Sequence, residues 1–216
     1  MGALDMRKLL LIFCILVSFV SYTWANKLTL TIVAGKEWSN QHIPQVAVWL
    51  EDVKGNYLRT IYVTETTSRN KWLFSLVSGR PESLPVWSHA AKHDVLPSNH
   101  KSQNDIAIDA ATYPTPKNGT KITDRIENSK NFVLKVEVNK SFDYNGFYEK
   151  ANTGVNGQPS IVFSSNIPAG YLGDLELNMV GTGAVDGNDG KIHDELTNLT
   201  SAKDIINSIM ARVSKK

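Results

Sequence analysis

Short runs in which apolar and polar residues alternate constrain the fold of this chain more than any other feature. Residues 27–33 place Leu28, Leu30 and Ile32 on one face. Residues 132–138 repeat the pattern with Phe132, Leu134, Val136 and Val138. Strict alternation indicates a half-buried strand, because successive side chains of a strand point to opposite sides of the sheet.

A hairpin is predicted next along the chain. Residues 45–51 and 57–63 are β-rich runs, and Gly55 lies in the short segment between them. Two such runs around a Gly-containing segment predict paired strands. Two further strands are predicted at 160–163 and 174–179, the second with Leu175, Leu177 and Met179 on one side.

Helical signals are fewer. Short helices are predicted at 71–77 and 84–93, the second with Pro85 in its first turn. Residues 200–212 predict a closing helix, because Ile205, Ile206 and Ile209 recur at helical spacing; residues 209–213 could instead form a last strand. The long polar segments 99–131 and 139–159 are predicted as loops. Strands without a βαβ alternation predict one antiparallel β-sandwich over 26–216 with short helical insertions.

The first 25 residues resemble a secretory signal. Arg7 and Lys8 precede the apolar run 9–20, which at 12 residues is shorter than the roughly 20 that a membrane span needs. Small residues at Thr23 and Ala25 predict cleavage before Asn26. We therefore expect a soluble exported protein, located in the periplasm, without a membrane span in the mature chain. The alternative is an uncleaved N-terminal anchor.

Composition excludes several classes of protein. The single cysteine, Cys14, lies inside the apolar run, so the mature chain has neither a disulfide nor a thiolate zinc site. Lys and Arg number 23 against 21 Asp and Glu, and no basic run is present. We therefore expect no nucleic-acid partner.

The order of several segments carries a family resemblance. They are 46–52, 55–60, 84–89 (LPVWSH), 108–117, 135–139, 141–145 and 156–160. In this order the chain resembles, over roughly residues 28–180, the predicted periplasmic proteins catalogued as domain of unknown function 2271. The resemblance implies a secreted β-sandwich with immunoglobulin-like character. It implies no activity, because the family has no agreed one.

Three histidines form a candidate metal site. His89 and His93 are four residues apart, so a helix would place them on one face, and His100 or Asp94 could add a third ligand. Imidazoles at this spacing can bind a divalent metal or a haem iron. The alternative is a pair of surface histidines on a polar turn.

The segment 109–115 is a candidate flavin site. Asp109, Thr112 and Thr115 match the Asp-x-x-Ser/Thr-Gly-Ala-Thr motif of proteins that carry covalent FMN, in which the last threonine is esterified to the flavin phosphate. Tyr113 and Pro114 replace the Gly-Ala of that motif. Glycine lets the backbone approach a bulky phosphate, and proline removes a backbone donor. The alternative is a sandwich turn.

Residues 186–195 resemble a calcium loop. Asp186, Asn188 and Asp189 provide oxygens close to two glycines. The spacing departs from the calcium pattern by one residue, and the twelfth position from Asp186 is Thr197 rather than glutamate. The alternative is an acidic turn between two elements.

An aromatic segment is the candidate ligand or partner surface. Aromatic rings mixed with amides and a carboxylate stack on sugars, peptides or other flat ligands. The alternative is a loop that folds its rings back over the edge of the sandwich. The residues are Phe142, Asp143, Tyr144, Asn145, Phe147 and Tyr148.

Known catalytic patterns are missing from the sequence. It has no Gly-x-Ser-x-Gly elbow, His-Glu-x-x-His helix, phosphate-binding glycine loop or dinucleotide fingerprint. We therefore expect a binding or accessory module that works with a protein partner in the cell envelope and has no assigned catalytic activity. The alternatives are a metal- or flavin-carrying electron-transfer protein and a hydrolase whose groups are dispersed along the chain.

Overall fold

The computed structural model describes residues 25–38, 42–64, 80, 82–91, 111–113, 119–154 and 156–216. Residues 1–24 of the predicted signal segment 1–25, and the predicted helix 71–77, lie outside these ranges, whereas Ala25 is the first residue of β1. The elements are β1 (Ala25–Ala34), β2 (Gln45–Glu51), β3 (Tyr57–Thr64), α3 (Pro85–Ala90), β4 (Ala111–Tyr113), β5 (Gly119–Glu127), β6 (Phe132–Asn139), α4 (Lys150–Thr153), β7 (Ile161–Ile167), β8 (Gly173–Glu176), β9 (Asn178–Thr182), the 3₁₀ turn η1 (Ser201–Asp204) and β10 (Ile206–Ser214).

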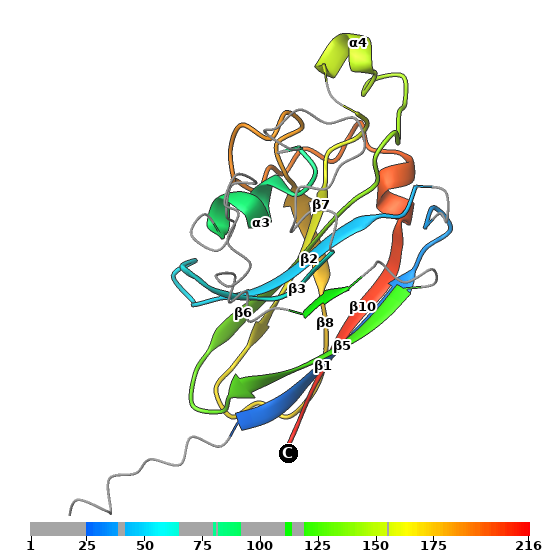
Figure 1. Ribbon diagram of the computed structural model, residues 1–216. Coiled ribbons are helices and arrows are strands. Elements are labelled where there is room, and N and C mark those ends of the chain that lie inside the picture. Colours follow the sequence, from blue (N-terminus) through cyan, green and yellow to red (C-terminus); the bar gives the residue numbers. More distant parts are fainter. Residues whose placement is uncertain are drawn as a thin grey trace, which may run out of the picture.

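Two sheets face each other, as the ribbon in Figure 1 shows. The smaller sheet has the strand order β5-β1-β10-β8, and the larger has β4-β3-β2-β6-β7-β9. Neighbouring strands are antiparallel except β3 and β4, which are parallel. The protein is therefore mainly β, and the predicted antiparallel β-sandwich with short helical insertions is confirmed. Its immunoglobulin-like character stays a prediction.

The main core lies between the sheets. The inward faces predicted from alternation are confirmed: Leu28, Leu30 and Ile32 of β1 pack with the four predicted residues of β6. The predicted hairpin is confirmed as β2 and β3. Strand β2 is buried along its whole length. Its even-numbered residues face the main core, while Ala47 and Trp49 face a second apolar cluster beneath α3.

The predicted single strand 174–179 is two strands in different sheets. β8 pairs with β10 in the smaller sheet, and β9 pairs with β7 in the larger one. Leu177, between them, is buried in the main core and donates its backbone N–H to Ile209 O at 3.0 Å. Leu175 and Met179 still pack on the same core, so the inward face was predicted correctly although the pairing was not.

The predicted closing helix 200–212 is wrong. Only η1 is helical, and β10 follows it, beginning earlier than the alternative strand 209–213. A register shift opposite Val33 and Ala34 leaves Asn207 as an extra residue in β10. Because of this bulge, the inward residue Ile209 comes three positions after Ile206 rather than two, which imitates helical spacing.

Strand β5 lies inside a segment that was predicted as a loop. It is an edge strand, and only Ile122 and Ile126 are buried. Between them stands Asp124, whose carboxylate pairs with Arg59 of β3. A charged residue at an inward position breaks the alternation by which a strand is recognised in sequence. In the described part of the chain, no helix has the length and apolar character needed to cross a membrane.

Candidate functional site

Two loops that are far apart in sequence form one open groove. The first follows β6 and carries Phe147 and Tyr148, and the second follows β9. Figure 1 shows these loops at the end of the sandwich where α4 lies. The groove has a volume of about 410 Å³, within the usual range of ligand sites. Its described lining is Phe147, Tyr148, Pro159, Thr182, Gly183, Ala184, Val185, Asp186, Asn188, Asp189, His193 and Glu195.

The aromatic wall is held in place by Asn145. The Asn145 side-chain oxygen accepts the backbone N–H groups of Phe147 at 3.0 Å and Tyr148 at 2.7 Å. Its amide nitrogen donates to Asn198 O at 2.9 Å and to Thr200 Oγ1 at 3.1 Å. One side chain thus ties the aromatic loop to the segment before β10.

The two rings of this wall have different exposures. Phe147 is 55% exposed, whereas Tyr148 is 6% exposed, and the rings meet edge to face with 4.9 Å between their centroids. Burial raises the pKa of Tyr148, and the nearby charge of Glu195 raises it further. Phe147 therefore offers a ring to a ligand, while Tyr148 supports it.

The opposite wall is acidic. Asp189 accepts the backbone N–H of Lys191 at 2.9 Å and lies 3.1 Å from His193 Nε2; these two hydrogen bonds lower the pKa of its carboxyl. Hydrogen bonds from the Thr197 side chain and backbone lower the pKa of Glu195. Both groups are therefore ionised at neutral pH. Among the described lining residues the groove has three carboxylates and no lysine or arginine.

The predicted calcium loop supplies this acidic wall. Asp186 accepts the backbone N–H of Asn188 at 3.0 Å and the Asn188 side-chain amide at 2.6 Å, which is the geometry of an acidic turn. Within the described ranges, no three side chains of His, Cys, Asp or Glu are grouped as metal ligands.

A buried polar cluster supports the aromatic loop from below. Asp143 accepts hydrogen bonds from Ser201 Oγ at 2.5 Å and Gln158 Nε2 at 3.1 Å. Lys140 Nζ lies 3.5 Å from the same carboxylate and 3.0 Å from that of Glu37. Four segments of the chain are joined at this point.

A second buried carboxylate lies under the floor of the groove. Glu137 is 0% exposed and accepts hydrogen bonds from the N–H groups of Val86 at 3.2 Å and Trp87 at 2.8 Å, and from Ser160 Oγ at 2.6 Å. It thus satisfies the first amides of α3, whose Pro85 has no N–H. Burial raises its pKa to about 7, against the opposing effect of these donors and of Lys135.

Changing Gly183 to alanine should lower the free energy of unfolding by about 1–3 kcal/mol, as overpacking of a filled site usually does. A Cβ at this position would lie 2.5 Å from Ser160 Oγ and 2.9 Å from Glu137 Oε1, below any normal contact. Chemical denaturation measures the effect. Gly146→Ala is the matched control, because a Cβ there meets nothing within 4 Å; equal losses in both variants would contradict the prediction.

The structure divides the predicted aromatic surface into parts. Phe147, Tyr148 and Asn145 build the groove, and Asp143 is buried beneath it. Phe142 is 52% exposed, and its ring centroid lies 5.3 Å from that of His42 and 5.7 Å from Arg80 Cζ. The Tyr144 ring lies beside it at a tilted angle, with 6.4 Å between the centroids. These two rings do not belong to the groove lining.

The predicted metal and flavin residues are described only in part. His89 lies on α3, with its Nε2 3.0 Å from Gly187 O. His93, His100, Asp109 and Thr115 lie outside the described residues. Thr112 lies in β4, where its backbone is opposite Val63. The divalent metal and FMN sites therefore stay predictions.

Sequence reasoning missed two features of this site. Glu137 looked like an ordinary outward polar residue of an alternating strand, and only its burial reveals it. His193 was isolated in sequence, although it lies four residues after Asp189. The proximity of the acidic loop to the aromatic loop had no signal in the sequence, because both are irregular.

Comparison with known proteins adds no relative. No family model, no curated protein and no solved structure matches the chain.

Proposed function

We propose that this protein is an exported binding module of the cell envelope, located in the periplasm, whose groove holds a basic segment of a protein partner. One observation carries the proposal: an exposed aromatic ring, Phe147, lines the same groove as three carboxylates, those of Asp186, Asp189 and Glu195. Membership of the family catalogued as domain of unknown function 2271 is part of the same proposal, and the leader-like sequence 1–25 supports export.

The chemistry of the groove suits a guanidinium or ammonium group. Such a cation gains from the face of an aromatic ring and from hydrogen bonds to carboxylates at the same time. Asp189 and Glu195 keep their charge at neutral pH because hydrogen bonds lower the pKa values of their carboxyl groups. An anionic ligand would be repelled, since the described lining has no lysine or arginine.

The test uses two defined peptides, one of alternating arginine and glycine and one with glutamine in place of each arginine. We expect the exported protein to bind the arginine peptide and to lose affinity as salt is added. Phe147→Ala should weaken binding about tenfold, because a half-exposed ring can contribute about 1.5 kcal/mol of apolar contact. Titration calorimetry gives both affinities.

Phe142→Ala is the matched control for this prediction. It removes the same side chain, of similar exposure, from the same loop but outside the groove. Its affinity should equal that of the wild type. Equal binding of the two peptides would contradict the proposal, as would tight binding of a neutral oligosaccharide in place of either peptide.

A further inference from the structure

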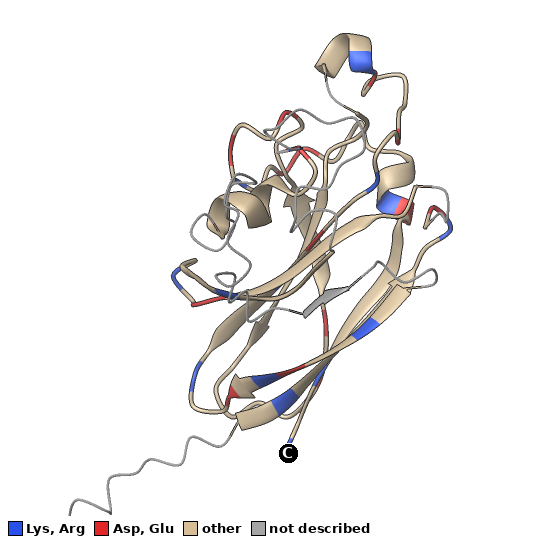
Figure 2. Cartoon of the chain, viewed as in Figure 1, with Lys and Arg blue, Asp and Glu red and all other residues tan. Residues whose placement is uncertain are grey.

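The end of the sandwich away from the groove carries an excess of positive charge. β1 begins there and β10 ends there, on the side opposite α4 (Figure 1). Lys27, Arg125 and Lys216 line one shallow depression, and Lys215 and Lys216 line the next. We call Lys27, Arg125, Lys215 and Lys216 the basic end. Figure 2 shows blue segments on the lower parts of β1 and β5, with red segments between them on β5.

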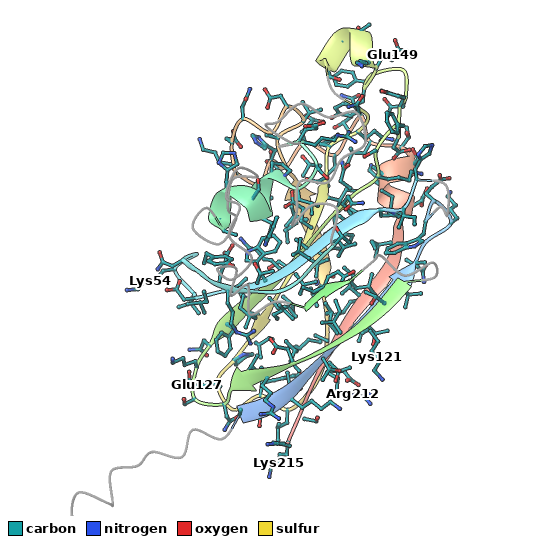
Figure 3. All side chains as sticks on the ribbon, viewed as in Figure 1. Lys54, Lys121, Glu127, Glu149, Arg212 and Lys215 are labelled. Carbon is teal, nitrogen blue, oxygen red and sulfur yellow. The ribbon has the colours of Figure 1, made fainter. Side chains whose placement is uncertain are left out.

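Carboxylates near the basic end already have cations of their own. Among the described residues, none of the four side-chain cations of the basic end has an ion pair, whereas Asp124, Glu127 and Asp174 each have one. Figure 3 shows Arg212 and Lys215 on this half of the molecule and Glu149 at the other end. The neighbouring pairs are Asp124 with Arg59 at 2.5 Å, Glu127 with Lys130 at 2.6 Å, and Asp174 with Arg212 at 2.6 Å.

Two of these cations are direct cross-strand neighbours. Lys27 of β1 stands opposite Arg125 of β5 in the antiparallel register. Like charges directly opposite each other destabilise a sheet. An external anion between them would offset this repulsion, so the pair favours an anionic partner.

An exposed leucine lies among the same cations. Leu172, in the loop between β7 and β8, is 45% exposed and lines one depression with Ala25, Lys215 and Lys216. Cations around an apolar side chain are typical of proteins that lie on a lipid surface, where the cations meet headgroups and the apolar group enters the interface. A soluble polyanion would give the leucine nothing to contact.

The sequence before β1 points to the same surface. The apolar run 9–20 ends five residues before Ala25, so at most about 18 Å of extended chain separates them. Ala25 itself lines both depressions of the basic end. While the apolar run is still attached during export, it would therefore hold the basic end next to the headgroups. After the predicted cleavage before Asn26, the cations of the basic end and Leu172 alone would make this contact.

We propose that the basic end, together with Leu172, docks on a surface of anionic phospholipid. Lys27 and Arg125 meet the phosphate groups, Lys215 and Lys216 extend the contact, and Leu172 enters the interface. This surface is separate from the groove and does not depend on the groove's ligand.

The test measures partition of the exported protein, recovered from its own host, onto vesicles. One set is phosphatidylcholine with about a third phosphatidylglycerol, and the other is phosphatidylcholine alone. We expect salt-sensitive binding to the first set only. Combining Lys27→Glu with Arg125→Glu should lower the partition coefficient at least about tenfold, since each basic residue near such a surface contributes about a factor of five. The two glutamates keep a like-charge pair, so stability stays comparable.

Combining Lys150→Glu with Lys203→Glu is the matched control, because it makes the same change in net charge at exposed positions near the groove end. It should bind vesicles like the wild type. Leu172→Ser should weaken vesicle binding several-fold and leave binding to soluble polyphosphate unchanged. Equal binding to both vesicle sets, equal loss in both double variants, or binding to polyphosphate without binding to vesicles would each overturn the proposal.

Discussion

Replacing Glu137 by leucine is expected to lower the free energy of unfolding by about 3–5 kcal/mol at pH 5. Three buried donors then lose their acceptor, and a buried donor without a partner costs about 1–3 kcal/mol. The donors are the amides of Val86 and Trp87 and the hydroxyl of Ser160. Leucine is apolar and of similar length, so no cavity adds to the loss. Denaturant unfolding followed by tryptophan fluorescence measures it.

The same carboxylate gives the wild type a pH-dependent stability. Burial raises the pKa of Glu137 from 4.5 to about 7, so the folded protein holds a proton that the unfolded chain releases. Its contribution is therefore fully present below pH 4.5 and is lost as the pH rises to about 7, by on the order of 3 kcal/mol. Glu137→Gln does not titrate and should lose this slope. Identical slopes in both proteins would contradict the raised pKa.

Replacing Asp143 by alanine is expected to cost about 2–4 kcal/mol of unfolding free energy, because it leaves a buried cation and two buried donors without this acceptor. Lys140 keeps Glu37 as a partner, which limits the loss. Ser201 and Gln158 would also release the segments that they hold. We therefore expect weaker binding of the arginine peptide as well, measured on the same samples by calorimetry.

Asp143→Asn is the matched control. It keeps the size of the side chain and one acceptor for Ser201, but it removes the charge that faces Lys140. The Asp143→Asn variant should lose less unfolding free energy than Asp143→Ala does. If Asp143→Ala stays within about 0.5 kcal/mol of the wild type, the usual range of exposed sites, the cluster does not hold the loop.

The sheets could be predicted from the sequence because burial on one face leaves a period of two. β1 and β6 show this period clearly, whereas β2 and β3 were predicted as β-rich runs around a Gly-containing segment, and the structure confirms all four strands. Where a strand is bulged, as in β10 at Asn207, the period shifts and the sequence imitates a helix.

The candidate groove could be predicted only in part. The aromatic residues and the acidic loop were each visible as separate patterns in the sequence. Their meeting depends on Asn145, whose side chain bonds to Asn198 and Thr200 more than 50 residues away. Glu137 likewise depends on α3 packing over β6, a contact that no local pattern contains.

The passage of the chain from one sheet to the other at Leu177 has a consequence for how the molecule opens. β8 and β9 are a single extended segment shared between the sheets, with Leu177 buried between them. Neither sheet can separate from the core without pulling on this segment. Slowly exchanging amides in β7 and β10 should therefore exchange with a common free energy, as one cooperative unit, rather than as two independent halves.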